Sequence, residues 1–206
     1  GIPGVRPAKV VVLGAGIVGS NAAQIAVGLG ADVAVLDVNA RVLAHLDEVY
    51  QGRLKTVVST AHAVAEEVRD ADLVIGAVLL AGARAPRLVT REMLRSMPRG
   101  AVIVDVSIDQ GGCVETSRPT THADPTFVEV GVVHYCVTNM PGAVARTSTL
   151  GLTNATLPYV QRLAAGGAKV LATDSGFAAG LNIQAGKIRH PAVALALARE
   201  SAAAAR

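Results

Sequence analysis

Short runs of Val, Ile and Leu alternate along the chain with Ala-rich stretches that carry apolar residues at helical spacing. The apolar runs are continuous and do not alternate with polar residues, which is typical of strands buried on both faces of a parallel sheet. The predicted strands are Lys9–Leu13, Asp32–Asp37, Thr56–Ser59, Leu73–Val78, Val102–Val106 and Val132–Val137. The predicted helices between them are Ile17–Leu29, a segment with Val42, Leu43, Leu46 and Val49 on one side, and Ala63–Arg69.

This order of elements predicts an α/β fold. Strands that alternate with helices form a parallel sheet, and right-handed crossovers place the helices on both of its faces. We therefore expect a doubly wound, mainly parallel sheet of the Rossmann type.

The pattern changes after about Arg146. Thr147 and Ser148 are suited to cap a long helix that follows them. Pro158 falls inside this helix and cannot donate to the carbonyl four residues earlier, so a kink is expected there.

The end of the chain holds too little regular structure for a second core. One strand is expected over Lys169–Thr173 and one helix over Ala192–Ala205. We therefore expect residues 1–146 to form the Rossmann domain. Residues 147–206 are expected to be a linking helix and a helical C-terminal remnant of a discontinuous second domain.

Composition excludes several classes of protein. Hydrophobic residues make up 51% and charged residues 17% of the chain, which fits a globular protein and not a disordered one. The uncharged, mostly apolar run Leu73–Ala83 is shorter than the roughly 20 residues of a membrane span. Trp is absent, aromatic residues are 2%, and the basic residues are scattered, so nucleic acid has no stacking platform. The net charge of +3 fits an ordinary solvated surface.

Cysteine usage and the start of the chain indicate a cytoplasmic protein. Cys113 and Cys136 occur without CxxC or metal-ligand spacing, so buried free thiols are favoured over a disulfide, and no metal site is predicted. The Pro/Gly-rich start at Gly1 lacks a signal-peptide pattern, and we expect a longer parent protein.

A glycine-rich motif, Gly14–Gly19 (GAGIVG), joins the first predicted strand to the first predicted helix. Gly14 permits the tight turn, Gly16 lets a pyrophosphate approach the backbone, and Gly19 lets the helix lie close to the sheet. The N–H groups and the positive dipole end of the helix then face the phosphates. A GxGxxG motif alone is weak, but this one follows a strand and opens a helix. The predicted contacts are Gly14, Gly16, Ile17, Val18 and Gly19.

An acid ends the second predicted strand, as the dinucleotide-binding motif requires. The carboxylate of Asp37 can accept hydrogen bonds from both hydroxyls of an adenosine ribose and would repel a 2′-phosphate, so NAD is favoured over NADP. Arg41 offers the alternative, because an arginine near this position can hold that phosphate; pointing to solvent is the favoured interpretation.

Ligands of open α/β sheets lie beyond the carboxyl ends of the strands. The segments Val78–Leu79, Val106–Gly112 and Thr138–Met140 fall there. Asp105 is expected to be a structural residue at a strand end. Asp109 lies where the nicotinamide ribose should be, although a loop-capping aspartate is an equal alternative from its position. None of the five histidines belongs to a nucleophile or metal pattern.

Three segments closely resemble bacterial alanine dehydrogenases: Val104–Cys113 (VDVSIDQGGC), Thr116–Thr121 (TSRPTT) and His134–Gly142 (HYCVTNMPG). The resemblance continues through Thr147–Tyr159 and into the segments around Asn182 and His190. The related transhydrogenase subunits share the fold and the glycine motif but differ in the segments after the fifth and sixth strands.

The resemblance implies a hexameric cytoplasmic enzyme that interconverts L-alanine with pyruvate and ammonia, using NAD. It implies that Asp37 holds the adenosine ribose, that Ser59 lies by the adenine, and that Asp109 is the catalytic aspartate. The other implied cofactor contacts are Val78, Leu79, Val106, Ser107, Ile108, Asp109, Arg118, Val137, Thr138, Asn139 and Met140.

Two departures from the family pattern matter. Val42 stands where the family often has a basic residue, for which Arg41 is the available substitute. The family takes its substrate-binding arginine and lysine and its acid/base histidine from a region that would precede Gly1. The chain alone is therefore expected to bind NADH without oxidising alanine.

Two other functions remain open at the level of sequence. One is an NAD(P) transhydrogenase alpha-type subunit, against which the residues around Asp109 and Met140 argue. The other is a non-catalytic module that binds or senses NAD.

Overall fold

The computed structural model describes residues 2–80 and 83–204, and its contacts divide the chain into two units, with the division falling between Met140 and Pro141. The boundary expected from composition, after Arg146, falls within the first turn of helix α5 (Ala145–Gly166).

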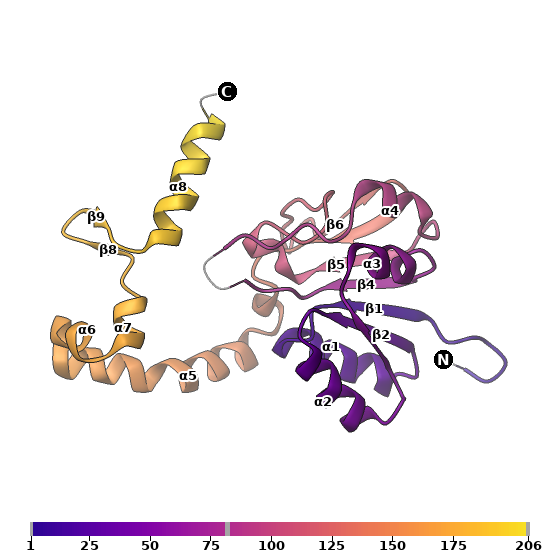
Figure 1. Ribbon diagram of the computed structural model, residues 1–206, viewed down its shortest axis with the longest axis horizontal. Helices are drawn as coiled ribbons and strands as arrows, with labels where there is room; N and C mark the ends of the chain where they lie inside the picture. The colour runs from indigo at the N-terminus through magenta and orange to yellow at the C-terminus, as the bar shows by residue number, and fades with distance from the viewer. Residues whose placement is uncertain (1, 81–82, 205–206) are drawn as a thin grey trace. The chain divides into compact units, whose positions relative to one another are not determined.

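The first unit is built on a seven-stranded sheet with the order β3-β2-β1-β4-β5-β7-β6 (Figure 1). All neighbours pair in parallel except β6 and β7, and the order reverses direction at β1, so the predicted doubly wound fold is confirmed. The strands are β1 (Lys9–Leu13), β2 (Asp32–Asp37), β3 (Lys55–Val58), β4 (Leu73–Gly76), β5 (Val102–Asp105), β6 (Thr126–Glu129) and β7 (Val132–Tyr135).

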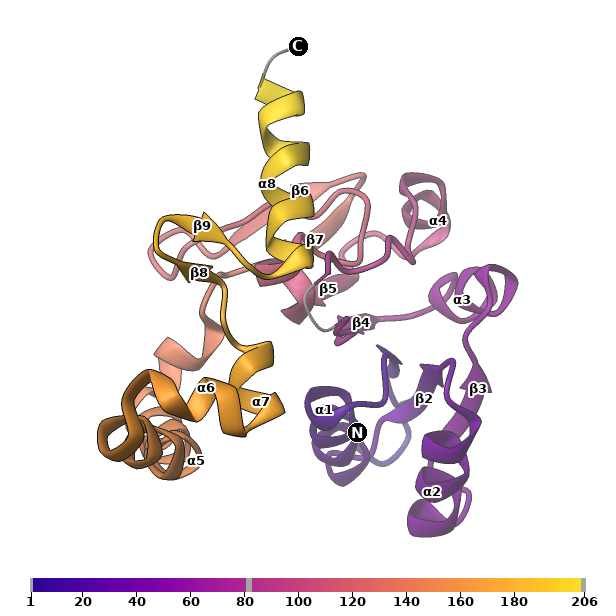
Figure 2. The same ribbon diagram turned by 60° about the vertical axis from the view of Figure 1, so that its left-hand side comes forward.

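Helices cover both faces of this sheet, α1 and α2 on one and α3 and α4 on the other (Figure 1 and Figure 2). Their bounds are α1 (Ile17–Gly28), α2 (Ala40–Tyr50), α3 (Ala61–Val68) and α4 (Arg91–Ser96). Alternate residues of β1 divide between two apolar cores, because successive side chains of a strand point to opposite faces. Val11 packs in the core that contains Val64 of α3, and Val12 packs in the core that contains Ala23 of α1.

Helix α2 buries a slightly different side from the predicted one. Leu43 and Leu46 are buried as expected, but Val49 is 51% exposed and Tyr50 takes its place in the core. The reason is helical spacing: Tyr50 lies four residues after Leu46 and seven after Leu43, on the same face.

Strand β6 and helix α4 of the first unit are not predicted from the sequence. Strand β6 forms a hairpin with β7 through Val130 and Gly131, which both have positive φ, 54° and 80°. A two-residue turn of this kind normally contains Asn, Asp or Gly at both places. Because Val130 occupies the first place, the sequence does not show the usual pattern of a hairpin turn. Helix α4 is a single short stretch capped by Thr90.

The second unit is mostly helical. After the 3-10 helix η2 (Met140–Val144), which begins in the first unit, it contains α5, the 3-10 helix η3 (Gly167–Lys169), α6 (Val170–Thr173), α7 (Ser175–Ala179), a small hairpin of β8 (Ile183–Gln184) and β9 (Lys187–Ile188), and α8 (Pro191–Ala204). Helix α5 buries none of its side chains, although it carries Leu150, Leu157 and Leu163. Ala205, where the last predicted helix ends, lies outside the described residues.

Two expectations for the second unit are wrong. The run Lys169–Thr173 is helical and not a strand: it ends η3 and forms α6, and the Thr173 hydroxyl donates back to the carbonyl of Val170 at 3.3 Å. Thr147 and Ser148 do not cap α5, which already begins at Ala145. The Ser148 hydroxyl instead donates to the carbonyl of Pro141 at 2.9 Å. Pro158 does lie inside α5.

None of the helices over residues 2–80 and 83–204 combines the length and the apolar character that a bilayer crossing demands. In the same part of the chain, no three His, Cys, Asp or Glu side chains gather as the ligands of a metal ion would.

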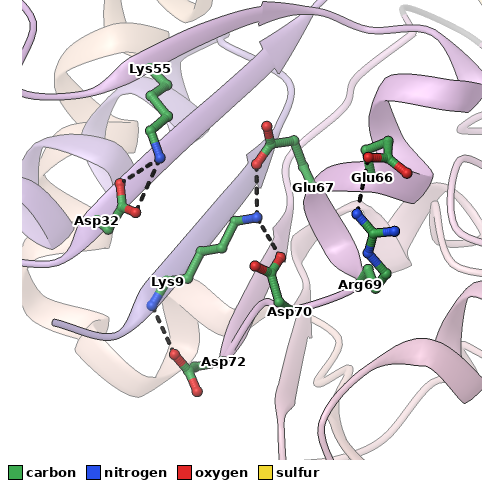
Figure 3. A network of polar contacts seen from close by, with 8 residues as sticks. All are labelled: Lys9, Asp32, Lys55, Glu66, Glu67, Arg69, Asp70 and Asp72. Atoms are coloured by element: carbon green, nitrogen blue, oxygen red, sulfur yellow. Dashed lines mark hydrogen bonds and ion pairs between the residues drawn. The ribbon is translucent and has the colours of Figure 1, made fainter. Parts of the chain in front are cut away.

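An ion-pair network lies at the amino ends of the central strands (Figure 3). Lys9 Nζ lies 2.9 Å from a Glu67 carboxylate oxygen and 2.6 Å from one of Asp70, and its backbone N–H donates to Asp72. Burial opposes the charge of Lys9, but the hydrogen bonds to Asp70 and Glu67 outweigh it and raise the lysine pKa. The hydrogen bond from Lys9 lowers the pKa of Asp70. Lys9 thereby ties β1 to the end of α3.

Replacing Lys9 by Met should therefore lower stability modestly. We expect a loss of about 1 kcal/mol, because Asp70 is largely exposed and water screens its charge. That corresponds to roughly 2–4 °C in melting temperature for a chain of this size. The contribution of Asp70 to the stability of the folded protein is present above its unfolded pKa, near 3.8. It is lost as the pH falls through the lowered pKa of Asp70 in the folded protein. The contribution of Lys9 to stability is lost only as the pH rises through the raised pKa of Lys9, above 10.5.

Thermal unfolding of the parent chain and the Lys9→Met variant across pH measures this difference. It should be constant between about pH 5 and pH 10 and shrink in acid. A difference that persists unchanged at pH 2 would contradict the ion-pair interpretation.

Candidate functional site

A cavity of about 880 Å³ opens at the carboxyl edge of the sheet in the first unit, and we call it the cleft. It gathers many of the predicted site residues, namely Gly14, Gly16, Ile17, Val18, Asp37, Ser59, Val78, Leu79, Val106, Ser107 and Asp109. Its remaining lining residues are Leu36, Val38, Ala77, Leu80, Pro86, Leu88 and Gln110.

The three glycines of the motif are required for different reasons. Gly14 has φ of +98°, and a Cβ there would lie 2.7 Å from the carbonyl oxygen of Ala77. A Cβ at Gly19, which lies buried beneath the turn, would collide with the carbonyl oxygen of Gly14. A Cβ at Gly16 would meet no protein atom within 4 Å, yet Gly16 lines the cleft. The fold therefore needs glycine at the first and third places, whereas at the second the space is left for a ligand.

Helix α1 begins at this turn without a side-chain cap. Gly16 occupies the N-cap position, and the first turn of the helix contains no acidic residue. The N–H groups of a helix start are anion-binding when no side chain satisfies them. The glycine turn and the start of α1 thus form a cradle that fits a pyrophosphate.

Asp37 braces the glycine turn from the end of β2. One carboxylate oxygen accepts the N–H of Ala15 at 2.7 Å, and the other accepts the N–H of Asn39 at 2.8 Å. Each oxygen can accept a further hydrogen bond, so the carboxylate can hold the turn and a ribose together. Asn39 caps α2 by accepting the N–H of Arg41, and Arg41 is exposed and does not line the cleft.

The opposite part of the cleft is formed by the 3-10 helix η1 (Val106–Gln110). The Ser107 hydroxyl donates to the carbonyl of Val78 at 2.8 Å and joins η1 to the segment after β4. The side chain of Ile108 is buried behind η1 and does not line the cleft. Asp109 is exposed and lines the cleft, and within residues 2–80 and 83–204 its carboxylate accepts no hydrogen bond.

The loop-capping aspartate of this region is Asp105. From the sequence, we expected only that it would be a structural residue at a strand end. Its fully buried carboxyl group accepts the N–H groups of Ser107 at 3.1 Å, Cys113 at 2.9 Å and Val114 at 3.2 Å. It also accepts the hydroxyl of Ser117 at 2.6 Å. The signal available in the sequence was the aspartate that ends β5, followed by the Gly-Gly pair that frees the later N–H groups to reach it.

Burial raises the pKa of the Cys113 thiol, and the neighbouring Asp105 raises it further. Burial also raises the pKa of Cys136. Both thiols are free and buried, as expected, and both stay protonated at neutral pH.

The structure does not bring the remaining predicted contacts into the cleft. The guanidinium carbon of Arg118 lies 4.0 Å from the centre of the Phe127 ring. Val137 is fully buried, and the N–H of Thr138 donates to the carbonyl of Thr120 at 3.2 Å. Asn139 has φ of 54°, and its carbonyl lies 3.1 Å from a ring nitrogen of His122. Met140 is the first residue of η2.

Comparison with known proteins gives a consistent family. The model of the "Alanine dehydrogenase/PNT, C-terminal domain" family matches residues 1–191. The chain is 63% identical over 201 residues to alanine dehydrogenase of Halomonas elongata, covering 97% of this chain and 54% of that protein. It is 52% identical over 202 residues to alanine dehydrogenase of Bacillus subtilis, covering 97% of this chain and 53% of that protein. The chain thus spans about half the length of these relatives.

Solved structures agree with the sequence comparison. An L-alanine dehydrogenase superposes with a TM-score of 0.86 at 51% identity, covering 97% of this chain and 55% of that one. A transhydrogenase from Sinorhizobium meliloti superposes with a TM-score of 0.72 at 31% identity, covering 91% of this chain and 51% of that one.

Proposed function

Because the chain belongs to the alanine dehydrogenase/PNT C-terminal domain family, we propose that it is the NAD-binding part of an alanine dehydrogenase. The proposed reaction of the parent enzyme is the reversible oxidative deamination of L-alanine to pyruvate and ammonia. Bound NAD supplies the hydride acceptor. A cytoplasmic homo-oligomer, a hexamer as the resemblance implies, is part of the same proposal.

The observation that carries this proposal is the open space at Gly16, at the start of an uncapped helix. The pyrophosphate takes this place, held by backbone N–H groups and by the dipole of α1. Asp37 binds the adenosine ribose, and Ser59 lies by the adenine. The nicotinamide half extends toward Val106 and Asp109, which follow the carboxyl end of β5 and line the cleft.

Asp109 is the proposed catalytic aspartate. It is exposed in the cleft without a hydrogen bond from the described part of the chain, so its carboxylate can accept one from a bound molecule. The described lining contains no Lys, Arg or His. A substrate carboxylate needs a cation, and its amine needs a proton shuttle. We propose that the rest of the parent enzyme supplies both.

Two alternatives are weaker. A transhydrogenase subunit agrees with the shared fold, but the likeness to the Sinorhizobium meliloti protein is 31% in sequence, against 51% for the L-alanine dehydrogenase. A module that binds NAD without turnover agrees with the absence of a cation from the described cleft lining. A parent enzyme that oxidises L-alanine would decide against both.

Cofactor choice tests the proposal directly. NADH should bind this chain about 100-fold more tightly than NADPH, because a 2′-phosphate would lie against the Asp37 carboxylate. Asp37→Ser should narrow this ratio to less than about tenfold, because it weakens NADH binding and removes the repulsion between the carboxylate and the 2′-phosphate of NADPH. Calorimetric titration with both cofactors measures the ratio.

Asp47→Ser is the matched control, since it removes the same charge from an exposed place on α2 that does not line the cleft. Its ratio should equal that of the parent chain. Equal affinities for NADH and NADPH in the parent chain would overturn the role of Asp37 and make Arg41 the candidate phosphate ligand.

A further inference from the structure

We infer that Asp105 is a positioning residue, which holds η1 in the shape that receives the nicotinamide half of the cofactor. The inference rests on the proposed dinucleotide-binding function. Asp105 does not line the cleft. It acts through Ser107 and Asp109, which do line it.

The contacts of Asp105 connect both ends of the loop that carries these residues. The N–H of Ser107 belongs to η1, whereas the N–H groups of Cys113 and Val114 belong to the segment that leaves it. Five donors thus converge on one buried carboxyl group, counting the hydroxyl of Ser117 and the thiol of Cys113, whose sulfur lies 3.6 Å from a carboxylate oxygen. Buried polar groups satisfied in this way fix a single local arrangement.

Two glycines leave room for the carboxyl group of Asp105 to lie close to the neighbouring backbone. A Cβ at Gly112, where φ is +78°, would lie 2.7 Å from an Asp105 oxygen. A Cβ at Gly76 would lie 3.0 Å from the other oxygen and would collide with the sulfur of Cys113. Glycine on two different segments therefore allows close approach to the Asp105 carboxyl group.

The fixed turn is joined directly to the cleft. The backbone N–H of Ser107 is held by the Asp105 carboxylate. The Ser107 hydroxyl donates to the carbonyl of Val78, a residue of the cleft lining. The carbonyl of Gln110, at the end of η1, accepts the N–H of Ala85 at 3.0 Å. A displacement of η1 would move the nicotinamide side of the cleft and leave the glycine turn in place.

Asn at position 105 preserves the size of the side chain but not its hydrogen bonding. One end of the amide is a donor, and every neighbour that Asp105 binds is itself a donor. Whichever way the amide is turned, at least one N–H of the loop faces an NH₂ group and loses its partner. The loop must then open on one side.

The experiment compares two ligands on the 206-residue chain, NADH and ADP-ribose, by fluorescence and calorimetric titration. ADP-ribose contains the adenosine and the pyrophosphate but lacks the nicotinamide. Asp105→Asn should weaken NADH about tenfold and change ADP-ribose less than about twofold. Lys9→Met is the matched control, because it lowers stability at the opposite edge of the sheet and should leave both affinities unchanged.

Equal weakening of both ligands by Asp105→Asn, or no weakening of either, would overturn the positioning role. A parent chain that binds neither NADH nor ADP-ribose would instead overturn the proposed function itself, and with it this inference. If Asp105→Asn does not fold, Ser117→Ala removes one donor and leaves the carboxyl group in place. It should weaken NADH about two- to threefold at constant ADP-ribose affinity, and an unchanged ratio would count against the inference.

Discussion

Asp109→Asn, introduced into the complete enzyme that carries this chain, should lower turnover by about 100- to 1,000-fold, the range for removing one group that stabilises charge in the transition state. NADH affinity should change by less than about threefold, because the pyrophosphate and the adenosine ribose provide most of it. The carboxylate lies exposed in the cleft, and no hydrogen bond from the described residues holds it. Its replacement therefore removes little from the folded structure.

Turnover, NADH affinity and thermal unfolding measured on one variant separate catalysis from loop capping. A capping aspartate would lower the melting temperature and weaken NADH together, a pattern that we expect of Asp105 variants and not of Asp109→Asn. Asp124→Asn serves as the control, because this exposed aspartate does not line the cleft. Turnover that survives Asp109→Asn unchanged would rule out the catalytic role.

Gly16→Ala should abolish most cofactor binding while the protein folds normally. The new methyl group would meet no protein atom within 4 Å, so stability is expected to hold, but it would occupy the place proposed for the pyrophosphate. We expect NADH to weaken about 100-fold, which equals about 2.7 kcal/mol. ADP-ribose should weaken equally, because it contains the same pyrophosphate.

Gly19→Ala is the informative partner of this variant. Its methyl group would collide with the carbonyl of Gly14 and push α1 away from the turn, an overpacking expected to cost about 1–3 kcal/mol of stability. The two alanine variants therefore separate a glycine that the ligand requires from one that the fold requires. Full NADH affinity in Gly16→Ala would show that the pyrophosphate does not lie against this turn.

The fold was predictable where hydrophobic periodicity and local turn chemistry agree. Strands β1 and β2 match their predicted bounds residue for residue, because both are continuous apolar runs buried on two faces. Strand β6 alternates Thr, Phe, Val and Glu at the edge of the sheet, and its burial depends on pairing with β7. Its pattern is too short to stand out without knowledge of that partner.

The lining of the cleft was predictable to a similar extent. The residues brought into the cleft follow the glycine motif or the ends of β2 to β5, such as Asp37 and Asp109, whereas the residues predicted after β7 do not line it. Asp105 binds Cys113, Val114 and Ser117 across 8 to 12 residues, so the aspartate and the later Gly-Gly pair indicate a turn but not which donors meet the carboxyl group. Arg118 stacks on Phe127, a residue of the edge strand that the sequence did not reveal.

The double duty of Asp37 constrains how cofactor preference could evolve or be engineered in this chain. The carboxylate that would discriminate against a 2′-phosphate is also the acceptor for the N–H groups of Ala15 and Asn39. A substitution of Asp37 that strengthens NADP binding therefore also removes hydrogen bonds from the loop that must hold the phosphates of either cofactor. A single mutational step would leave a less ordered site before it produced a new preference. Asn at position 37 offers an intermediate, since its amide oxygen can keep one of the two hydrogen bonds without the negative charge.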